Sequence, residues 1–167
     1  MSKKLLISDA NIIIDMVAGE LVDAMFSLPY EFGTPDILYV EELEEQHSDM
    51  IDAGLQLYEL SPAYIDRTIE YLQLDIARRV SANDCMALAL AQQEQCCLLT
   101  GDARLRQLAT TQGVTVRGTL WLVEAMLSEG QISVCEAQIA YQKMKHDGSR
   151  LPTEEIKNQL SRFNQRQ

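Results

Sequence analysis

Short apolar runs alternate along this chain with longer segments of helical periodicity, and this alternation limits the folds that it can adopt. Buried strands are expected over residues 4–8, 37–40, 55–60, 96–100 and 114–117. Helices are expected over residues 11–26, 41–53, 62–74, 81–93 and 103–111. Strands that alternate with helices predict a mostly parallel sheet with helices on both faces. The expected fold class is therefore α/β, with a turn over residues 33–36 before the second strand.

From Thr119 onward the pattern is wholly helical. Helices are expected over residues 119–128, 134–145 and 154–163, separated by Gly130, Gly148 and Pro152. A segment of about 45 residues forms only a small core of its own. We therefore expect an α/β domain over residues 1–118 and a C-terminal helical extension over residues 119–167, packed on the same domain.

The charge balance restricts the possible partners. The chain has 167 residues, with 14 Lys and Arg against 25 Asp and Glu, which gives a net charge of −11. Such an acidic surface opposes non-specific binding to nucleic acids and to anionic membranes. Binding of a nucleic acid would therefore need local basic patches or bound cations, whereas a basic partner protein would be attracted.

Several other classes of protein are disfavoured by the sequence. The four cysteines include no C-x-x-C pair and the two histidines are far apart, so the spacing of a zinc finger is absent. No apolar stretch approaches the roughly 20 residues of a membrane span. The first apolar run is too short for a signal peptide. The expected location is the cytoplasm, without membrane association.

Four acidic residues occupy positions that a parallel sheet would bring to one edge. Asp9 follows the first strand, Glu42 opens the helix after the second, Asp84 lies in the first turn after Ser81, and Asp102 follows the strand 96–100. Ligands bind at the carboxyl ends of the strands in open α/β sheets. Crowded carboxylates repel one another unless a cation lies between them, and Mg²⁺ prefers oxygen ligands. These positions predict a metal site.

Helix capping offers an alternative explanation for each acid. Asp9 and Asp102 can cap the helices that follow them, and Ser81 with Asp84 forms an S-x-x-D capping box. Glu42 is one of four glutamates that open a helix, where the helix dipole favours negative charge, and Glu41 competes with it for the site. Capping does not, however, predict that acids recur after successive strands.

Motifs of other chemistries are absent, while neutral oxygens lie beside two of the acids. The sequence has no G-x-G-x-x-G, P-loop or G-x-S-x-G motif, and no histidine suited to a catalytic triad. Asn11 and Thr100 can supply neutral ligands or hydrogen bonds next to Asp9 and Asp102.

The acidic positions and their flanking residues resemble those of PIN-domain nucleases. The matching segments are Ser8-Asp9-Ala10-Asn11, Val40-Glu41-Glu42-Leu43, Ser81-Ala82-Asn83-Asp84 and Leu99-Thr100-Gly101-Asp102. The resemblance covers about residues 4–118. The stretch Gly118-Thr119-Leu120-Trp121-Leu122 and the helical tail are similar to a subgroup of PIN-like toxin ribonucleases with extra C-terminal helices.

The resemblance implies a three-layer α/β/α fold and an endoribonuclease that cleaves single-stranded RNA with Mg²⁺ or Mn²⁺. It implies Asp9, Asp84 and Asp102 as the principal metal ligands, with Glu42 completing the site or orienting the attacking water. It also implies the toxin of a toxin–antitoxin pair, inhibited by an antitoxin protein, and a homodimer. Four arginines that flank the site in sequence either form a phosphate-binding rim or lie on solvated helix faces; they are Arg78, Arg79, Arg104 and Arg106.

Two other functions compete with this interpretation. A haloacid-dehalogenase-like phosphohydrolase also places Asp after the first strand, but it needs a D-x-D motif, and here the sequence is Asp9-Ala10-Asn11. A PIN-fold binding module without nuclease activity would fit the net charge of −11.

Overall fold

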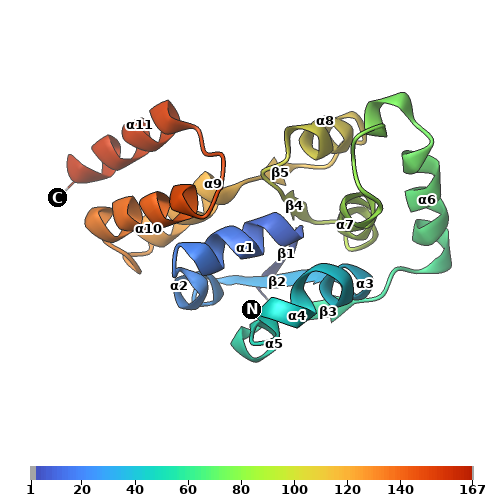
Figure 1. The fold of residues 1–167 in the computed structure, drawn as a ribbon, viewed down its shortest axis with the longest axis horizontal. Helices are drawn as coiled ribbons and strands as arrows, with labels where there is room; N and C mark the ends of the chain where they lie inside the picture. Colours follow the sequence, from blue (N-terminus) through green and yellow to red (C-terminus); the bar gives the residue numbers. More distant parts are fainter. Residues whose placement is uncertain (1–2, 167) are drawn as a thin grey trace.

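A five-stranded parallel sheet lies at the centre of the computed structural model, which describes residues 3–166 (Figure 1). The sheet has the order β3-β2-β1-β4-β5, and every neighbouring pair is parallel. Its strands are β1 Lys4–Ser8, β2 Tyr30–Pro35, β3 Gln56–Tyr58, β4 Cys97–Leu99 and β5 Val116–Arg117. The expected α/β class is thereby confirmed.

Helices cover both faces of this sheet. Successive strand residues point to opposite faces, and the neighbours Leu98 and Leu99 on β4 are both fully buried. The helical elements before β5 are α1 Ala10–Ala18, α2 Val22–Phe26, α3 Asp36–Leu38, a turn of π-helix η1 Tyr39–Leu43, α4 Glu44–His47, α5 Met50–Ala53, α6 Pro62–Leu72, a 3₁₀ turn η2 Asp75–Ala77, α7 Ala82–Gln93 and α8 Ala103–Thr111. After β5 follow α9 Thr119–Ser128, α10 Val134–His146 and α11 Thr153–Asn164.

The central helix α7 is buried against the middle of the sheet. It packs on β1, β2 and β4, and its buried side chains are small or unbranched at Cβ, which allows a close approach. The helix begins as the sequence predicts, because the Ser81 hydroxyl accepts a hydrogen bond from the Asp84 N–H at 3.0 Å. The bounds of α8 and α9 also match the predicted helices.

The second strand lies earlier in the chain than the sequence predicts. The expected turn at residues 33–36 and the expected strand at 37–40 are wrong, because β2 extends to Pro35 and helix follows at once. Ile37 and Val40 are 47% and 59% exposed, whereas Leu38 is buried, which is a helical pattern. A short apolar run does not distinguish a strand from a helix by periodicity. Gly33 lies within β2, where the absence of a side chain makes room for the Tyr58 ring, since a Cβ there would lie 2.5 Å from it.

Two predicted helices are interrupted. The expected helix 11–26 breaks after Gly19, where Glu20 adopts a φ of +58°, and the chain resumes as α2. The expected helix 41–53 is divided into the end of η1, α4 and α5. Gly54 ends this segment with a φ of +132°, as its position in the sequence predicts.

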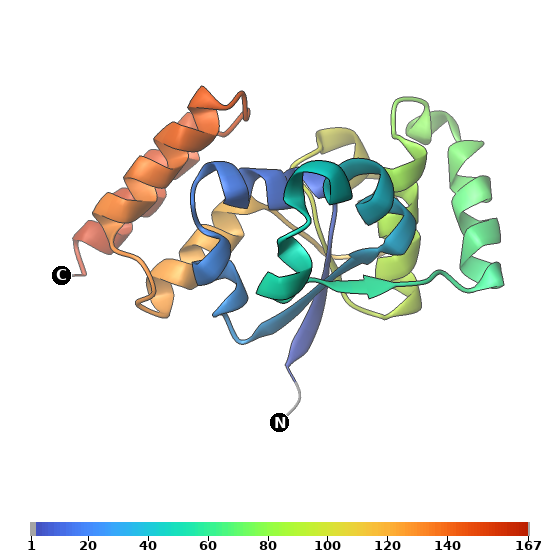
Figure 2. The ribbon, with the colours of Figure 1, turned by 60° about the horizontal axis from the view of Figure 1, so that its bottom comes forward.

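The three C-terminal helices pack on the N-terminal part of the α/β fold. Helices α9 and α10 contact α1, α9 also contacts α2, and α11 packs on α9 and α10. Figure 2 shows α10 and α11 at one end of the molecule and α6 at the other. The proposed division at residue 118 stays a prediction, and residues 1, 2 and 167 lie outside the described part. No helix within residues 3–166 is long and apolar enough to cross a membrane.

A buried glutamine joins the three C-terminal helices. The Tyr141 hydroxyl on α10 donates to Gln159 Oε1 on α11 at 2.6 Å, and Gln159 Nε2 donates to the Leu120 carbonyl on α9 at 2.9 Å. Gln159 is buried, so each of its amide atoms needs a partner inside the protein.

We predict that Tyr141→Phe lowers the free energy of unfolding by about 1–3 kcal/mol, because it leaves Gln159 Oε1 buried without a donor. Tyr58→Phe is the matched control, since the Tyr58 hydroxyl bonds to Gln56 at the surface. Urea denaturation of both variants measures the difference. Equal stability of the two variants would contradict the structural role of Gln159.

Candidate metal centre

Asp9 is held in a fixed position at the end of β1. Its Oδ1 accepts a hydrogen bond from the Ile12 N–H at 3.0 Å and caps α1, and its Oδ2 accepts one from the Thr100 hydroxyl. The Asp9 N–H donates to the Leu99 carbonyl at 3.0 Å. Asp9 is fully buried, so these contacts replace the water that a carboxylate would otherwise bind.

Thr100 connects Asp9 to Asp102. Its hydroxyl oxygen accepts a hydrogen bond from the Asp102 N–H at 3.0 Å while its hydrogen points to Asp9. Asp102 caps α8 with Oδ1, which accepts from the N–H groups of Arg104 and Leu105 at 2.8 and 3.1 Å. Within residues 3–166 the Asp102 Oδ2 has no hydrogen-bond donor, so capping leaves this oxygen available for another ligand.

Asp84 faces the same edge of the sheet from the first turn of α7. Within the described residues its carboxylate makes no hydrogen bond back to the Ser81 N–H, so the expected capping box is only half formed. The pKa of Asp84 is raised to about 6, chiefly by burial and also by the charges of Asp102 and Glu42, against a lowering by the Ser81 side chain.

The other acids also raise the pKa of Asp9, although its burial raises it more. The pKa of Asp9 is raised to about 7, chiefly by burial; the charges of Asp84 and Asp102 contribute to this rise, and the hydrogen bonds from Thr100 and Ile12 oppose it. The structure therefore brings together the four acids that the sequence predicts as neighbours. Their catalytic and metal-binding roles stay predictions.

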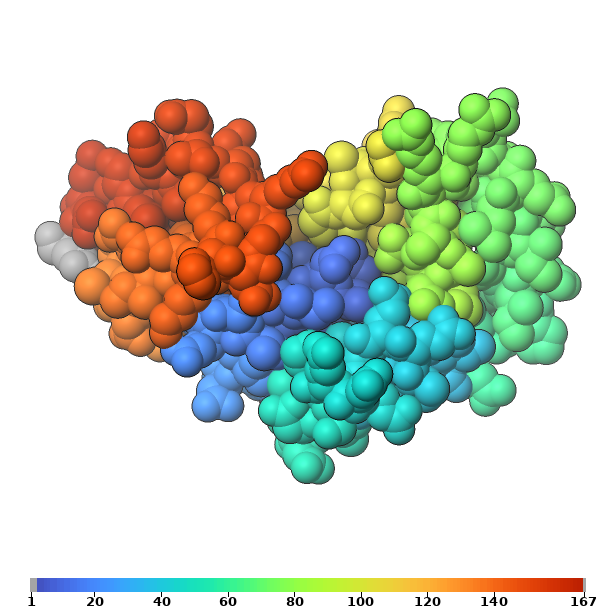
Figure 3. Space-filling view, viewed as in Figure 1, coloured from blue at the N-terminus to red at the C-terminus, as the bar shows by residue number. Residues whose placement is uncertain are grey.

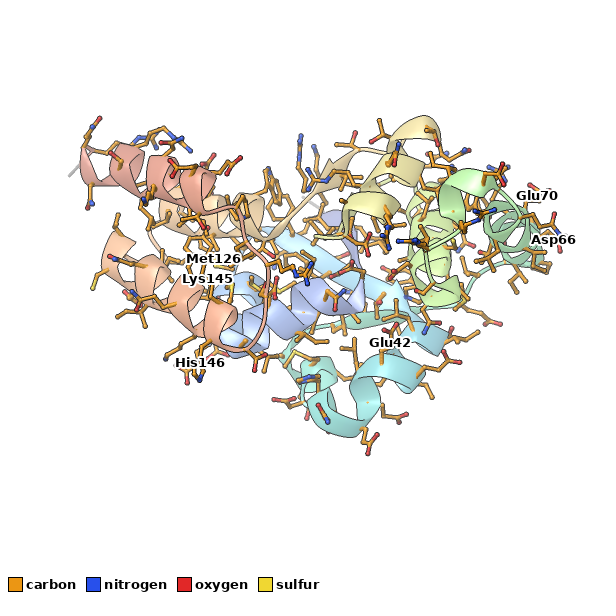
Figure 4. The ribbon with its side chains drawn as sticks, turned by 45° about the horizontal axis from the view of Figure 1, so that its top comes forward. Glu42, Asp66, Glu70, Met126, Lys145 and His146 are labelled. Atoms are coloured by element: carbon orange, nitrogen blue, oxygen red, sulfur yellow. The ribbon has the colours of Figure 1, made fainter. Side chains whose placement is uncertain are left out.

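A turn of π-helix places Glu41 and Glu42 at this edge. Glu41 Oε2 accepts a hydrogen bond from Asn83 Nδ2 at 2.9 Å and so ties η1 to the start of α7. Glu42 has the charge that raises the pKa of Asp84. Figure 4 shows Glu42 on the side of η1 that faces the centre of the molecule. The geometry favours Glu42 over Glu41 as the fourth acid, and single π-helical turns are frequent at functional sites.

The donor set fits a hard, hydrated cation. Within residues 3–166 no three acidic, histidine or cysteine side chains converge closely enough to enclose an ion as they stand. Mg²⁺ needs no such enclosure, because it keeps several waters and is usually held by one or two carboxylates. The carboxylates of Asp84 and Asp102 have oxygens that hydrogen bonds within residues 3–166 do not saturate, which matches that requirement.

A cavity of about 360 Å³ lies beside Asp102 and is lined by Asn11, which the sequence suggested, and by residues that it did not suggest. Asn11 and Asp15 from α1 line it, together with Asp147 and Arg150 from the loop between α10 and α11. In Figure 3 the surface of α1 (blue) lies in a depression between the C-terminal helices (orange to red), α8 (yellow) and η1 (cyan).

Asp15 was detectable from the sequence, whereas the loop residues were not. Asn11 and Asp15 are four residues apart and share one face of α1. The Thr119 hydroxyl donates to Asp15 Oδ2 at 2.9 Å, and burial raises the pKa of Asp15. Asp147 and Arg150 reach the cavity only because α10 packs on α1. The four arginines that were expected either at a rim or on solvated helix faces are all exposed, and Arg106 also lines an adjoining cavity.

Comparison with known proteins identifies one family. A family model described as "DUF3368: PIN domain" matches residues 5–165, which includes the C-terminal helices. A PilT N-terminus domain protein from the hyperthermophilic archaeon Sulfolobus solfataricus P2 has a similar structure, with a TM-score of 0.51 and 15% sequence identity. The likeness covers 74% of this chain and 92% of that protein, and at this identity it shows the fold alone. No curated protein matches the chain by sequence.

The raised pKa values predict how stability depends on pH in the metal-free protein. Between pH about 4 and 7 the folded Asp9 keeps a proton that the unfolded chain has lost, so the contribution of Asp9 to stability is full below pH 4 and is lost as the pH rises to about 7. We predict that Asp9→Asn removes this decrease, which amounts to about 4 kcal/mol over the range. Denaturation in chelator at several pH values measures it, with the exposed Asp66→Asn as control. An unchanged pH profile for Asp9→Asn would contradict the prediction.

Proposed function

We propose that this chain, which belongs to the PIN-domain family, is a divalent-metal-dependent endoribonuclease that cleaves single-stranded RNA. PIN domains are typically nucleases. The observation that carries the proposal is the group of acids at the carboxyl ends of β1 and β4, where burial and mutual repulsion raise the pKa values of Asp9 and Asp84. A site of this kind is stabilised when a cation binds between the carboxylates.

The contacts of the four acids support a different role for each of them in this proposal. Asp9 is fixed by Thr100 and Ile12 and sets the position of the site. Asp84 and Asp102 have oxygens available for a cation, directly or through water. Bound Mg²⁺ or Mn²⁺ would lower the pKa of a water and neutralise charge on the phosphodiester during in-line attack. Glu42, exposed at the opening of the site, is placed to orient the attacking water. No protein nucleophile is needed.

A second function receives support from two observations. The described residues contain no preformed enclosure for an ion, and the net charge of −11 disfavours contact with RNA. Both observations fit a PIN-fold module that binds a partner without cleaving RNA. Calorimetric titration with Mg²⁺ and Mn²⁺ separates the two functions, since binding that Asp102→Asn abolishes supports the enzyme. Absence of binding to the folded wild type supports the module.

We predict that purified protein cleaves single-stranded RNA in Mg²⁺ or Mn²⁺ and that Asp84→Asn lowers the cleavage rate at least about 100-fold. The neutral side chain keeps the shape but removes a charge that would hold the cation. Asp66→Asn, on the exposed face of α6 far from the site, is the matched control (Figure 4). Equal rates for wild type and Asp84→Asn, or full activity in excess chelator, would refute the assignment.

We further propose that the protein is the toxin of a toxin–antitoxin pair, acts in the cytoplasm and forms a homodimer. The net charge of −11 supports a basic antitoxin segment that inserts an arginine among the carboxylates. We predict that a small protein encoded beside this chain co-purifies with it and suppresses cleavage, and that light scattering gives twice the 18.8 kDa of one chain. Failure of the neighbouring protein to bind would contradict the toxin–antitoxin proposal. A measured mass equal to that of a single chain would contradict the homodimer.

A further inference from the structure

A second cavity, of about 540 Å³, lies next to the candidate metal centre and is lined by three arginines. Arg106 comes from α8, Arg117 from β5 and Arg150 from the loop between α10 and α11. This cavity shares Gly101 and Arg150 with the smaller cavity that contains Asp102. The two cavities therefore form neighbouring parts of one surface, with acids at one side and arginines at the other.

The three guanidinium groups are not neutralised by the protein. Within residues 3–166 none of them forms an ion pair within 4.0 Å, although the chain has 25 acidic residues. Glu155 contributes one negative charge to the lining, which leaves an excess of positive charge. In a chain with a net charge of −11, such a group of unpaired arginines marks a local site for an anion.

The backbone around the cavity also suits an anion. Helix α9 begins at Gly118, which has no side chain to cap it, and its first residues line the cavity. The uncapped N–H groups of a helix start attract anions. A Cβ on Gly118 would lie 3.3 Å from Arg106 Nη2, so the glycine allows the guanidinium to lie close to the helix start.

An aromatic ring lines the same cavity. Trp121 is half-buried and packs against Tyr30 with ring centroids 5.5 Å apart, which fixes its orientation. Arg117 lies over the Trp121 ring with its guanidinium carbon 5.9 Å from the centroid. Arginines that follow the backbone and an aromatic ring on which a base stacks are the combination that binds single-stranded nucleic acids.

We propose that this cavity, the arginine pocket, binds one nucleotide of single-stranded RNA next to the phosphate that is cleaved. The arginines and the start of α9 hold its phosphate, and its base stacks on Trp121. This inference rests on the proposed endoribonuclease function. It explains how a strongly acidic protein retains RNA beside a group of carboxylates, and it gives the C-terminal helices a part in substrate binding through Arg150.

The test measures RNA binding without cleavage. Trp121 is the single tryptophan of the chain, so its fluorescence reports on the arginine pocket. Wild-type protein in excess chelator is titrated with a short single-stranded RNA and with a duplex of the same sequence. The single strand should quench Trp121, because its bases are free to stack. Equal quenching by the duplex would overturn the base-stacking contact.

Variants of the lining should change affinity in opposite directions. Arg117→Gln combined with Arg150→Gln should reduce the salt slope of log K by about 1.4 and weaken binding roughly 10- to 30-fold at 0.1 M salt, because each phosphate contact to a single strand contributes about 0.7. Glu155→Gln should bind more tightly, a gain that loss of folding cannot produce. Arg67→Gln on α6, at the far end of the molecule, is the control for loss of a positive charge away from the pocket.

The outcomes separate this inference from the proposed function. RNA cleavage by the wild type, together with wild-type affinity and salt slope in the double variant, would overturn the arginine pocket and leave the nuclease intact. Binding that depends on the arginines without any metal-dependent cleavage would support the pocket and contradict the nuclease.

Discussion

The hydrogen bond from Thr100 to Asp9 joins the ends of two neighbouring strands, and the candidate metal centre depends on it. A carboxylate that is fully buried at the end of β1 would be costly without partners, and Thr100 and the Ile12 N–H supply them. Thr100 also accepts from the Asp102 N–H, so the same hydroxyl fixes the start of α8. The parallel sheet thereby sets the distance between the acids before any ligand binds.

Helix capping and ligand binding turn out to be compatible in this arrangement. Asp9 and Asp102 both cap helices, as the simpler interpretation of the sequence predicts. Asp102 does so with one oxygen, which leaves the other available. Capping also fixes the carboxylates against the sheet edge, where they repel one another and gain from a cation. The positions that stabilise the helices are therefore the positions at which a metal site can form.

The C-terminal helices change the electrostatics of the site. The α/β part places acids at the sheet edge, and the packing of α10 on α1 adds Arg150 and Asp147 from the loop that follows. Arg117 and Trp121 lie at the junction with α9. The negative net charge of the chain thus coexists with a local surface on which arginines without an ion pair inside residues 3–166 adjoin carboxylates.

The sequence by itself determined the α/β class, most helices, and the four acids at one edge, because strand–helix alternation and capping residues act locally. It misplaced the second strand, since the run Ile37–Val40 has the apolar character of a strand and only pairing of β2 with β1 shows that residues 30–35 fill that place. Only the tertiary structure showed that Glu41 contacts Asn83 and that Glu42 lies near enough to Asp84 for its charge to raise the pKa of that residue. Only the tertiary structure placed Arg150 at the site, because Arg150 is far from the acids in sequence and comes near them when α10 packs on α1.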